Sequence, residues 1–206
     1  MTLPNQLSIL RIILTPFFVV TYLMTSLTFN YISFLIFFVA SMTDYYDGVI
    51  ARKYGVVTLW GRFLDPLADK ILVSAAFIAF ALTNLVEVWM VAVIIIRDVI
   101  ITALRSYAMF KDKPIVTSYL AKAKTFTQMT LVYVIFVFVL AQKTLIAKNQ
   151  GLGIIEKVNS WNIIYLCMLF VTLLTLVSGV KYLFENRGHL KSFAVDFYRV
   201  FMPSDL

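Results

Sequence analysis

The longest stretch without a charged residue is the feature that most constrains the fold of this chain. From Ile12 to Thr43 the sequence contains no Asp, Glu, Lys or Arg, a run of 32 residues. A membrane-spanning helix needs about 20 mostly apolar residues, so this run is too long for one ordinary span. The polar residues between Thr25 and Asn30 offer a turn, which predicts two helices back to back.

The composition indicates that lipid is the surrounding solvent. Hydrophobic residues make up 61% of the 206 residues and charged residues 14%, whereas a soluble domain carries roughly 25% charged residues. Cys167 is the only cysteine, which excludes a disulfide scaffold and a cysteine-based metal site within one chain. The length suits one domain over residues 1–206. The net charge of +7 fits the basic cytoplasmic side of a membrane protein better than nucleic-acid binding.

Further apolar segments at residues 71–86, 88–110, 125–142 and 158–180 complete a predicted all-α bundle of six transmembrane helices. Both ends of the chain also carry apolar residues at helical spacing, as amphipathic helices in the headgroup layer do. These residues are Leu3, Leu7 and Leu10 near the start and Phe193, Phe197 and Phe201 in the tail. Packing of these segments against the bundle is the open alternative.

The lysine and arginine counts orient the bundle, because six spans leave both termini on one side. With cytoplasmic termini, eleven basic residues lie inside: Arg52, Lys53, Arg62, Lys111, Lys113, Lys122, Lys124, Lys181, Arg187, Lys191 and Arg199. Three lie outside, all in one loop: Lys143, Lys148 and Lys157. The count predicts that both termini are cytoplasmic.

Four of the eleven acidic residues fall between positions 44 and 69, each at the end of an apolar run. Asp44 and Asp47 are three residues apart and Asp65 and Asp69 are four apart, so each pair lies on one face of its helix. Carboxylates at such depth indicate function, and four in close contact need cations to stay ionised. Mg²⁺ or Mn²⁺ prefers such oxygen ligands. The alternative is a salt-bridge network with Arg52, Lys53, Arg62 and Lys70.

The residues between the aspartates fit a site that handles phosphate. Small residues allow a ligand to approach the helix backbone, and an arginine adds positive charge; these residues are Gly48, Ala51, Gly61 and Arg52. Pro66 suits the first turn of a helix with Asp65 as its cap. If that helix begins earlier, near Trp60, Pro66 lies inside it.

The whole pattern resembles the signature of the CDP-alcohol phosphotransferases and is complete in every fixed position. It reads Asp44, two residues, Asp47-Gly48, two residues, Ala51-Arg52, eight residues, Gly61, three residues, Asp65, three residues, Asp69. A pattern of this length is far more specific than a lone glycine motif. The resemblance implies a six-helix membrane fold, usually a homodimer, that moves a phosphatidyl group from a CDP-lipid to an alcohol and releases CMP.

A wider resemblance, over roughly residues 1–140, is to the bacterial phosphatidylglycerophosphate synthases of this family. It rests on Leu3-Pro4-Asn5-Gln6-Leu7 with Arg11, Phe63-Leu64-Asp65-Pro66-Leu67-Ala68-Asp69-Lys70, Arg97-Asp98-Val99-Ile100-Ile101-Thr102 with Arg105, and Lys122-Ala123-Lys124-Thr125 with Gln128. Asp98 stands where that subfamily more often has Glu, and Ala121 where it has Gly. The likeness implies a bacterial cytoplasmic membrane and the transfer from CDP-diacylglycerol to glycerol 3-phosphate, giving phosphatidylglycerophosphate and CMP.

The resemblance also implies a role for each site residue. Two divalent cations on the four aspartates would neutralise the pyrophosphate and stabilise the leaving CMP. Asp69 would take the proton from the attacking hydroxyl, and Asp65 would bridge both metals. The CDP moiety would lie against Asp44, Gly48, Ala51, Arg52 and Gly61.

The acceptor phosphate needs a second cationic pocket, for which the candidates are Arg97, Arg105, Lys122 and Lys124. Arg97 lies about nine residues, or about 14 Å, into its helix. This depth is near mid-membrane, where an unpaired arginine is costly. The alternative is that Arg97 pairs with Asp98 or with a neighbouring helix, and that the lysines only set the topology.

Two rival functions remain open at this point. The first keeps the chemistry and changes the acceptor to phosphatidylglycerol, serine or inositol phosphate. The second is a divalent-cation channel or transporter that uses the aspartates as its ion site. Arg52, Arg97 and Arg105 argue against this second rival, because they would repel a permeant cation.

Overall fold

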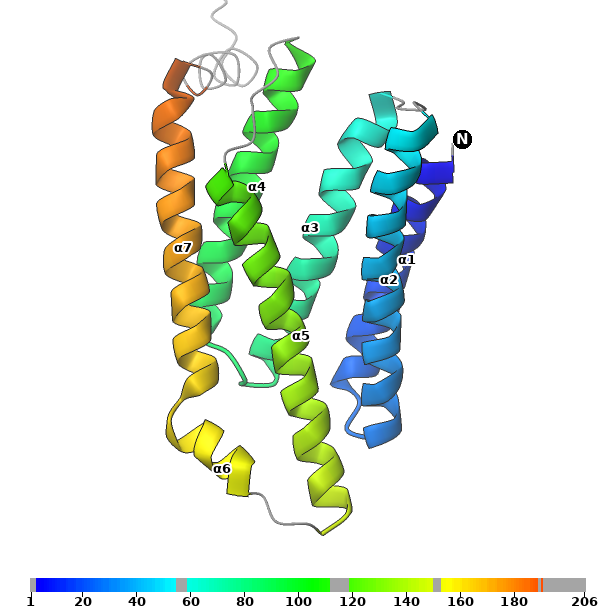
Figure 1. The fold of residues 1–206 in the computed structure, drawn as a ribbon, viewed down its shortest axis with the longest axis vertical. Coiled ribbons are helices and arrows are strands. Elements are labelled where there is room, and N and C mark those ends of the chain that lie inside the picture. Colours follow the sequence, from blue (N-terminus) through cyan, green and yellow to red (C-terminus); the bar gives the residue numbers. More distant parts are fainter. Residues whose placement is uncertain (1–2, 55–58, 112–118, 150–152, 189, 191–206) are drawn as a thin grey trace, which may run out of the picture.

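The computed structural model describes residues 3–54, 59–111, 119–149, 153–188 and 190. Side chains are described for residues 6–43, 67–109, 111, 123–149, 153, 155, 156, 158, 160–188 and 190. This part of the chain contains seven helices and no strand, which confirms the all-α prediction (Figure 1). The helices are α1 (Leu3–Leu23), α2 (Leu27–Tyr54), α3 (Leu59–Leu82), α4 (Val88–Phe110), α5 (Tyr119–Ala147), α6 (Gly153–Ser160) and α7 (Ile163–Glu185).

Six long helices run side by side along one axis, and the short α6 lies at one end (Figure 1). The end of the bundle at which α2 ends and α3 begins is called the α2–α3 end below. Figure 1 shows that α1 begins, and α4 and α7 end, at this same end. The two helices of the aspartate pattern are therefore connected at the end of the bundle at which α4 and α7 also end.

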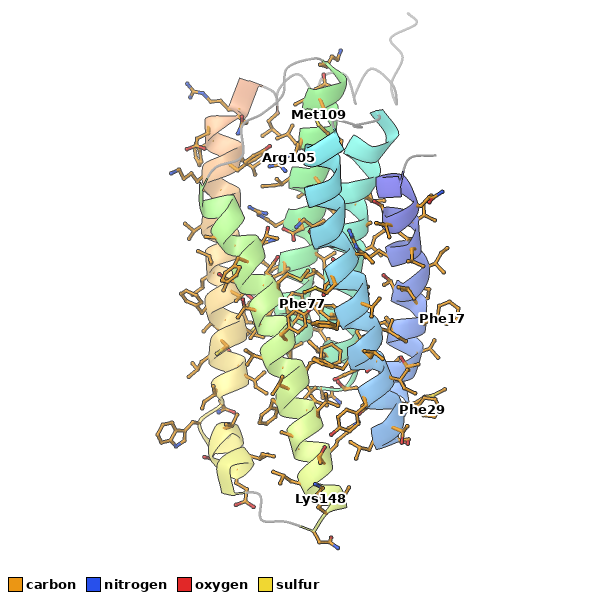
Figure 2. The ribbon with its side chains drawn as sticks, turned by 45° about the vertical axis from the view of Figure 1, so that its right-hand side comes forward. Phe17, Phe29, Phe77, Arg105, Met109 and Lys148 are labelled. Atoms are coloured by element: carbon orange, nitrogen blue, oxygen red, sulfur yellow. The ribbon has the colours of Figure 1, made fainter. Side chains whose placement is uncertain are left out.

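Within the described residues, three of these helices are long and apolar enough to cross a membrane. The spans are Gln6–Leu23, Ala123–Ala147 and Ile163–Glu185. Their outer faces expose large apolar side chains such as Phe17, which points away from the bundle in Figure 2, and Phe170. Such surfaces are disfavoured in water and suited to lipid. The chain is thus a helical membrane bundle.

An aromatic cluster fills the middle of the bundle between α1, α2, α3 and α5. Its centre is Phe136 of α5, whose ring is 1% exposed and lies 5.3 Å from the ring of Phe80 and 5.7 Å from that of Phe18 between centroids. The further rings around it are Tyr22, Phe34, Phe37 and Tyr133. Most pairs are tilted or edge-to-face, the arrangement that ring quadrupoles favour.

Asparagines end several of the helices. The Asn30 side chain donates to the carbonyl of Tyr22 in the last turn of α1 and to that of Met24 just after it, where carbonyls have no partner within the helix. Asn84 and Asn162 adopt φ angles of 55° and 48°, in the left-handed region that asparagine tolerates better than most residues. They lie just after α3 and just before α7, where the chain reverses direction.

Two predicted features agree with the structure. The break in the 32-residue uncharged run falls at residues 24–26, between α1 and α2. The helix predicted over residues 88–110 has those bounds in α4.

Other boundaries differ from the prediction. The third helix begins at Leu59, in agreement with the alternative start near Trp60, so Pro66 lies inside it and Asp65 is not its cap. The fifth helix continues to Ala147, and Lys143 therefore lies in α5 instead of a loop, donating its ammonium to Asn30.

The terminal regions also differ from the prediction. The segment predicted as one helix over residues 158–180 is divided into α6 and α7 by a turn at 161–162. Residues 3–10 continue into α1 without a break, and among residues 6–10, whose side chains are described, Ser8 is buried and Leu10 is exposed. The tail with Phe193, Phe197 and Phe201 lies outside the described residues.

Candidate active site

The four aspartates of the sequence pattern lie on two consecutive helices at matching depths. Asp44 is ten residues before the end of α2 at Tyr54, and Asp69 is ten residues after the start of α3 at Leu59. Asp47 and Asp65 are seven and six residues from the same ends. At 1.5 Å per residue, Asp44 and Asp69 lie about 15 Å from these helix ends, and Asp47 and Asp65 lie about 10 Å from them. The backbone therefore places Asp44 at the depth of Asp69, and Asp47 at the depth of Asp65, below the α2–α3 end.

Most of the predicted metal and CDP residues fall outside the described side chains. Asp44, Asp47, Gly48, Ala51 and Arg52 lie in α2, and Gly61 and Asp65 lie in α3. Among the side chains that are described, no group of three or more His, Cys, Asp or Glu residues lies together. The donor set suits a hard divalent cation by its chemistry, since it consists of carboxylates at helical spacing on adjacent helices.

Asp69 is the described member of the four, and it has a cationic neighbour. Its side chain is half-buried, and its carboxylate lies 3.5 Å from the Lys70 ammonium. Lys70 also lies 4.0 Å from the carboxylate of Asp98 on α4. The Lys70 ammonium thus stands between two carboxylates from neighbouring helices.

Asp98 joins three helices through its carboxylate. Lys124 of α5 donates to both of its oxygens, and Arg97 donates from Nη1 to Oδ1 at 3.0 Å. Asp98 and Lys124 are almost completely buried, with side chains 5% and 1% exposed. Arg97 also reaches α7, where its Nη2 donates to the Ser178 hydroxyl at 2.9 Å. These contacts, with Lys70, form what we call the Asp98 network: Lys70, Arg97, Asp98, Lys124 and Ser178.

The predicted acceptor residues are brought together in part. Arg97 and Lys124 meet at Asp98, so Arg97 has the partner that the alternative interpretation expected. Arg105 lies two turns further along α4, nearer the α2–α3 end (Figure 2). Lys122 is in α5, and its side chain lies outside the described set. A groove of about 360 Å³ between α3 and α4 is lined by Lys70 and Asp98, by hydroxyl side chains and by apolar side chains.

A buried arginine lies one turn from the first aspartate. Arg11 of α1 is 1% exposed and donates from Nε to the carbonyl of Ala40 on α2, at 3.1 Å. Ala40 is four residues before Asp44, so this cation is held next to the turn that carries the first predicted ligand.

Sequence reasoning named Lys70 and Asp98 only as alternative ion-pair partners, and it missed Ser178. Lys70 and Asp98 are each adjacent to a predicted residue and part of a family motif, and a carboxylate in the middle of an apolar helix is itself a signal. Ser178 gave only a weak signal, as a polar residue beside a glycine in an otherwise apolar span. Its partner Arg97 is 81 residues away in sequence, so no spacing rule connects the two.

Several known proteins similar to this chain carry the name CDP-diacylglycerol–glycerol-3-phosphate 3-phosphatidyltransferase. That of Bacillus subtilis (strain 168) is 33% identical over 202 residues, which cover 92% of this chain and 97% of the relative. That of Rickettsia bellii (strain RML369-C) is 33% identical over 180 residues, 87% and 92% of the two chains. That of Salmonella paratyphi A is 38% identical over 133 residues, 62% and 72% of the two chains.

One protein-family model matches most of the sequence. The family model described as CDP-alcohol phosphatidyltransferase matches residues 1–173, which include α1 to α6, the four aspartates and most of the Asp98 network. Ser178 lies beyond the matched range. The chain therefore belongs to the CDP-alcohol phosphatidyltransferase family.

Proposed function

We propose that this protein transfers the phosphatidyl group of CDP-diacylglycerol to glycerol 3-phosphate, giving phosphatidylglycerophosphate and CMP. The observation that supports this most is the run of charged contacts from Asp69 through Lys70 to Asp98 and on to Lys124 and Arg97. It connects the candidate base with two candidate acceptor residues inside one bundle. The names of the relatives in Bacillus and Rickettsia support the same substrates.

The aspartates are proposed to hold two divalent cations, Mg²⁺ or Mn²⁺. Two observations support this proposal. Carboxylate oxygens are ligands that such cations prefer, and Asp44 lies at the depth of Asp69 as Asp47 does at that of Asp65. When bound, such cations neutralise pyrophosphate charge and stabilise the departing phosphate. Gly48, Ala51, Arg52 and Gly61, together with Asp44, are proposed to bind the CDP moiety.

Asp69 is proposed as the general base. The acceptor hydroxyl oxygen forms a bond to the phosphorus that bears the diacylglycerol, and the bond from that phosphorus to the oxygen of CMP breaks. The hydroxyl proton passes to the Asp69 carboxylate. Lys70, 3.5 Å from this carboxylate, holds it on the side of α3 that faces Asp98.

An excess of positive charge makes the Asp98 network a suitable place for an acceptor phosphate. Three cations, those of Lys70, Arg97 and Lys124, surround the single carboxylate of Asp98. Burial weakens the screening of such charges, so an anion nearby is strongly attracted. Arg105 and Lys122 are proposed to complete the pocket toward the α2–α3 end.

The remaining proposals concern the setting of the enzyme. We place the α2–α3 end in the cytoplasm of a bacterium, with six spans and both termini inside, because the lysine and arginine count favours it. Arg105 and Lys148 lie toward opposite ends of the bundle (Figure 2), so Lys148 faces outward in this orientation. A homodimer in the cytoplasmic membrane follows from the family resemblance.

The direct experiment measures CMP release from CDP-diacylglycerol by the purified protein in detergent, with each alcohol in turn. We expect release with glycerol 3-phosphate, dependence on Mg²⁺ or Mn²⁺, and its loss after chelation. Asp69→Asn should reduce the rate by about 10²–10⁴-fold, the range for removing a general base.

The outcomes separate the rival functions. Release with phosphatidylglycerol, serine or inositol phosphate instead of glycerol 3-phosphate would keep the chemistry and change the acceptor. Metal flux across vesicles without CMP release would favour a cation transporter. Near wild-type activity of Asp69→Asn would remove Asp69 as the base.

A further inference from the structure

Arg97 of α4 passes directly over a glycine of α7. A Cβ atom built on Gly179 would lie 2.9 Å from Cγ of Arg97 and 3.1 Å from its Nε. The first distance is shorter than real Cβ contacts allow, so an alanine here would force the arginine stem aside. Glycine in a helix interior is destabilising by about 1 kcal/mol relative to alanine, and a packing requirement such as this explains its presence.

The residue before this glycine holds the other end of the same side chain. The Ser178 hydroxyl donates to the Thr175 carbonyl at 3.0 Å, so its only proton is occupied by its own helix. Its oxygen can therefore only accept from Arg97 Nη2, at 2.9 Å. Ser178 is 2% exposed, and water does not compete for this bond.

The two contacts together set the direction of the Arg97 guanidinium. Gly179 gives the stem a path close to α7, and Ser178 and Asp98 accept from the two terminal nitrogens. Asp98 in turn holds Lys124. A displacement of Arg97 at α7 is thus transmitted to the arrangement of the cations around Asp98.

We propose that Ser178 and Gly179 are positioning residues for acceptor recognition: by fixing Arg97 against α7 they set the affinity for the phosphate of the acceptor alcohol. The inference rests on the proposed function, in which Arg97 belongs to the acceptor pocket. It gives a role to a part of α7 that lies beyond the range matched by the family model.

The test compares two Michaelis constants in Ser178→Ala and Gly179→Ala. Each variant should raise the KM for glycerol 3-phosphate about tenfold, the change that accompanies about 1.4 kcal/mol. The KM for CDP-diacylglycerol should stay within about twofold, because that substrate is bound by α2 and α3 in the proposed function. If both KM values rise together, or neither changes, the positioning role is wrong.

The matched controls come from the same end of the chain. At Gly188 an added Cβ would meet nothing within 4 Å, so Gly188→Ala should leave both KM values unchanged. Thr172→Val removes a buried hydroxyl that donates to the Met168 carbonyl of its own helix, and it should also leave the ratio of the two KM values unchanged. A rise in the KM for glycerol 3-phosphate in either control would mean that any change in α7 has this effect, and would overturn the inference.

A double-mutant cycle checks the contact by a route independent of activity. Gly179→Ala should lower the thermal midpoint of the detergent-solubilised protein in the wild-type background and not in the Arg97→Ala background, where no stem is in the way. Equal effects in both backgrounds would contradict the contact. The proposed function fails separately, if wild-type protein releases no CMP with any alcohol.

Discussion

The aromatic cluster and the Asp98 network both join helices inside the bundle, but by different physics. The cluster joins α1, α2, α3 and α5 around Phe136 through many ring contacts, each weak and tolerant of small shifts. The network joins α3, α4 and α5 through one carboxylate that three cations share, and Arg97 extends it to α7 through Ser178. Loss of one ring leaves the other rings packed, whereas loss of Asp98 leaves Arg97 and Lys124 without the carboxylate that they share, and Lys70 keeps Asp69.

In the proposed function, this difference separates the region that holds the fold from the region that binds the acceptor. Replacing a buried ion pair by apolar residues is often neutral or stabilising, so stability alone does not explain the presence of a buried network. The proposed binding of an acceptor phosphate gives the three cations around Asp98 a role. The aromatic cluster needs no such explanation, because dense packing is how helices associate in lipid.

The largest effect is expected from Asp98→Ala, which breaks the network. It leaves Lys124 and Arg97 without the carboxylate they share, and breaking a buried pair in this way is destabilising by about 3–5 kcal/mol. The free energy of unfolding in detergent and the rate of CMP release should both fall. Asp98→Asn keeps the shape and one oxygen and should be affected less. A stability equal to wild type in Asp98→Ala would show that the network is not holding the helices.

The next effect is expected in the aromatic cluster. Phe136→Ala should lower the free energy of unfolding by about 3 kcal/mol, because it opens a cavity between four helices. The KM for glycerol 3-phosphate should not change, since Phe136 contacts none of the Asp98 network in the ring contacts described. Phe136→Leu, which fills much of the cavity, is the control. A selective rise in this KM would contradict the division between the two regions.

The smallest effect is expected for an ion pair of the same chemistry on the surface. Lys181 and Glu185 lie 3.7 Å apart on α7, with side chains about half exposed. An exposed pair at this spacing is worth about 0.3–0.5 kcal/mol and is screened by salt. Glu185→Gln should therefore shift the thermal midpoint only slightly, and the shift should vanish at high salt. If Glu185→Gln lowered stability as much as Asp98→Ala, burial would not be what distinguishes the Lys181–Glu185 pair from the ion pairs of Asp98.

The lengths and positions of the apolar runs predicted most of the fold correctly. The α4 bounds and the break between α1 and α2 follow from the positions of charged and polar residues along the chain. The apolar runs alone did not give the helix ends where helical structure continues through polar sequence. The start of α3 at Leu59 lies twelve residues before the apolar run at Ile71 and agrees with the alternative start near Trp60; local hydrogen bonding, not hydropathy, decides such ends.

Some features of the candidate site could likewise be read from the sequence, and others could not. The spacing of Asp44, Asp47, Asp65 and Asp69 could be read from the sequence because each pair is local to one helix. The pairing of Lys70 with Asp98, and of Arg97 with Ser178, could not be read from it. These contacts join residues on different helices, so they depend on how the helices pack.

By itself the sequence determined the solvent, the class of fold and the residue types available for chemistry, because hydropathy, composition and spacing within a helix are local properties of the chain. Only the tertiary structure decided that Lys70, Lys124 and Arg97 share one carboxylate and that Gly179 leaves the path for the Arg97 stem. The physical reason is that a contact between two helices depends on their relative rotation and depth. Both are set by packing over the whole bundle and not by any segment of it.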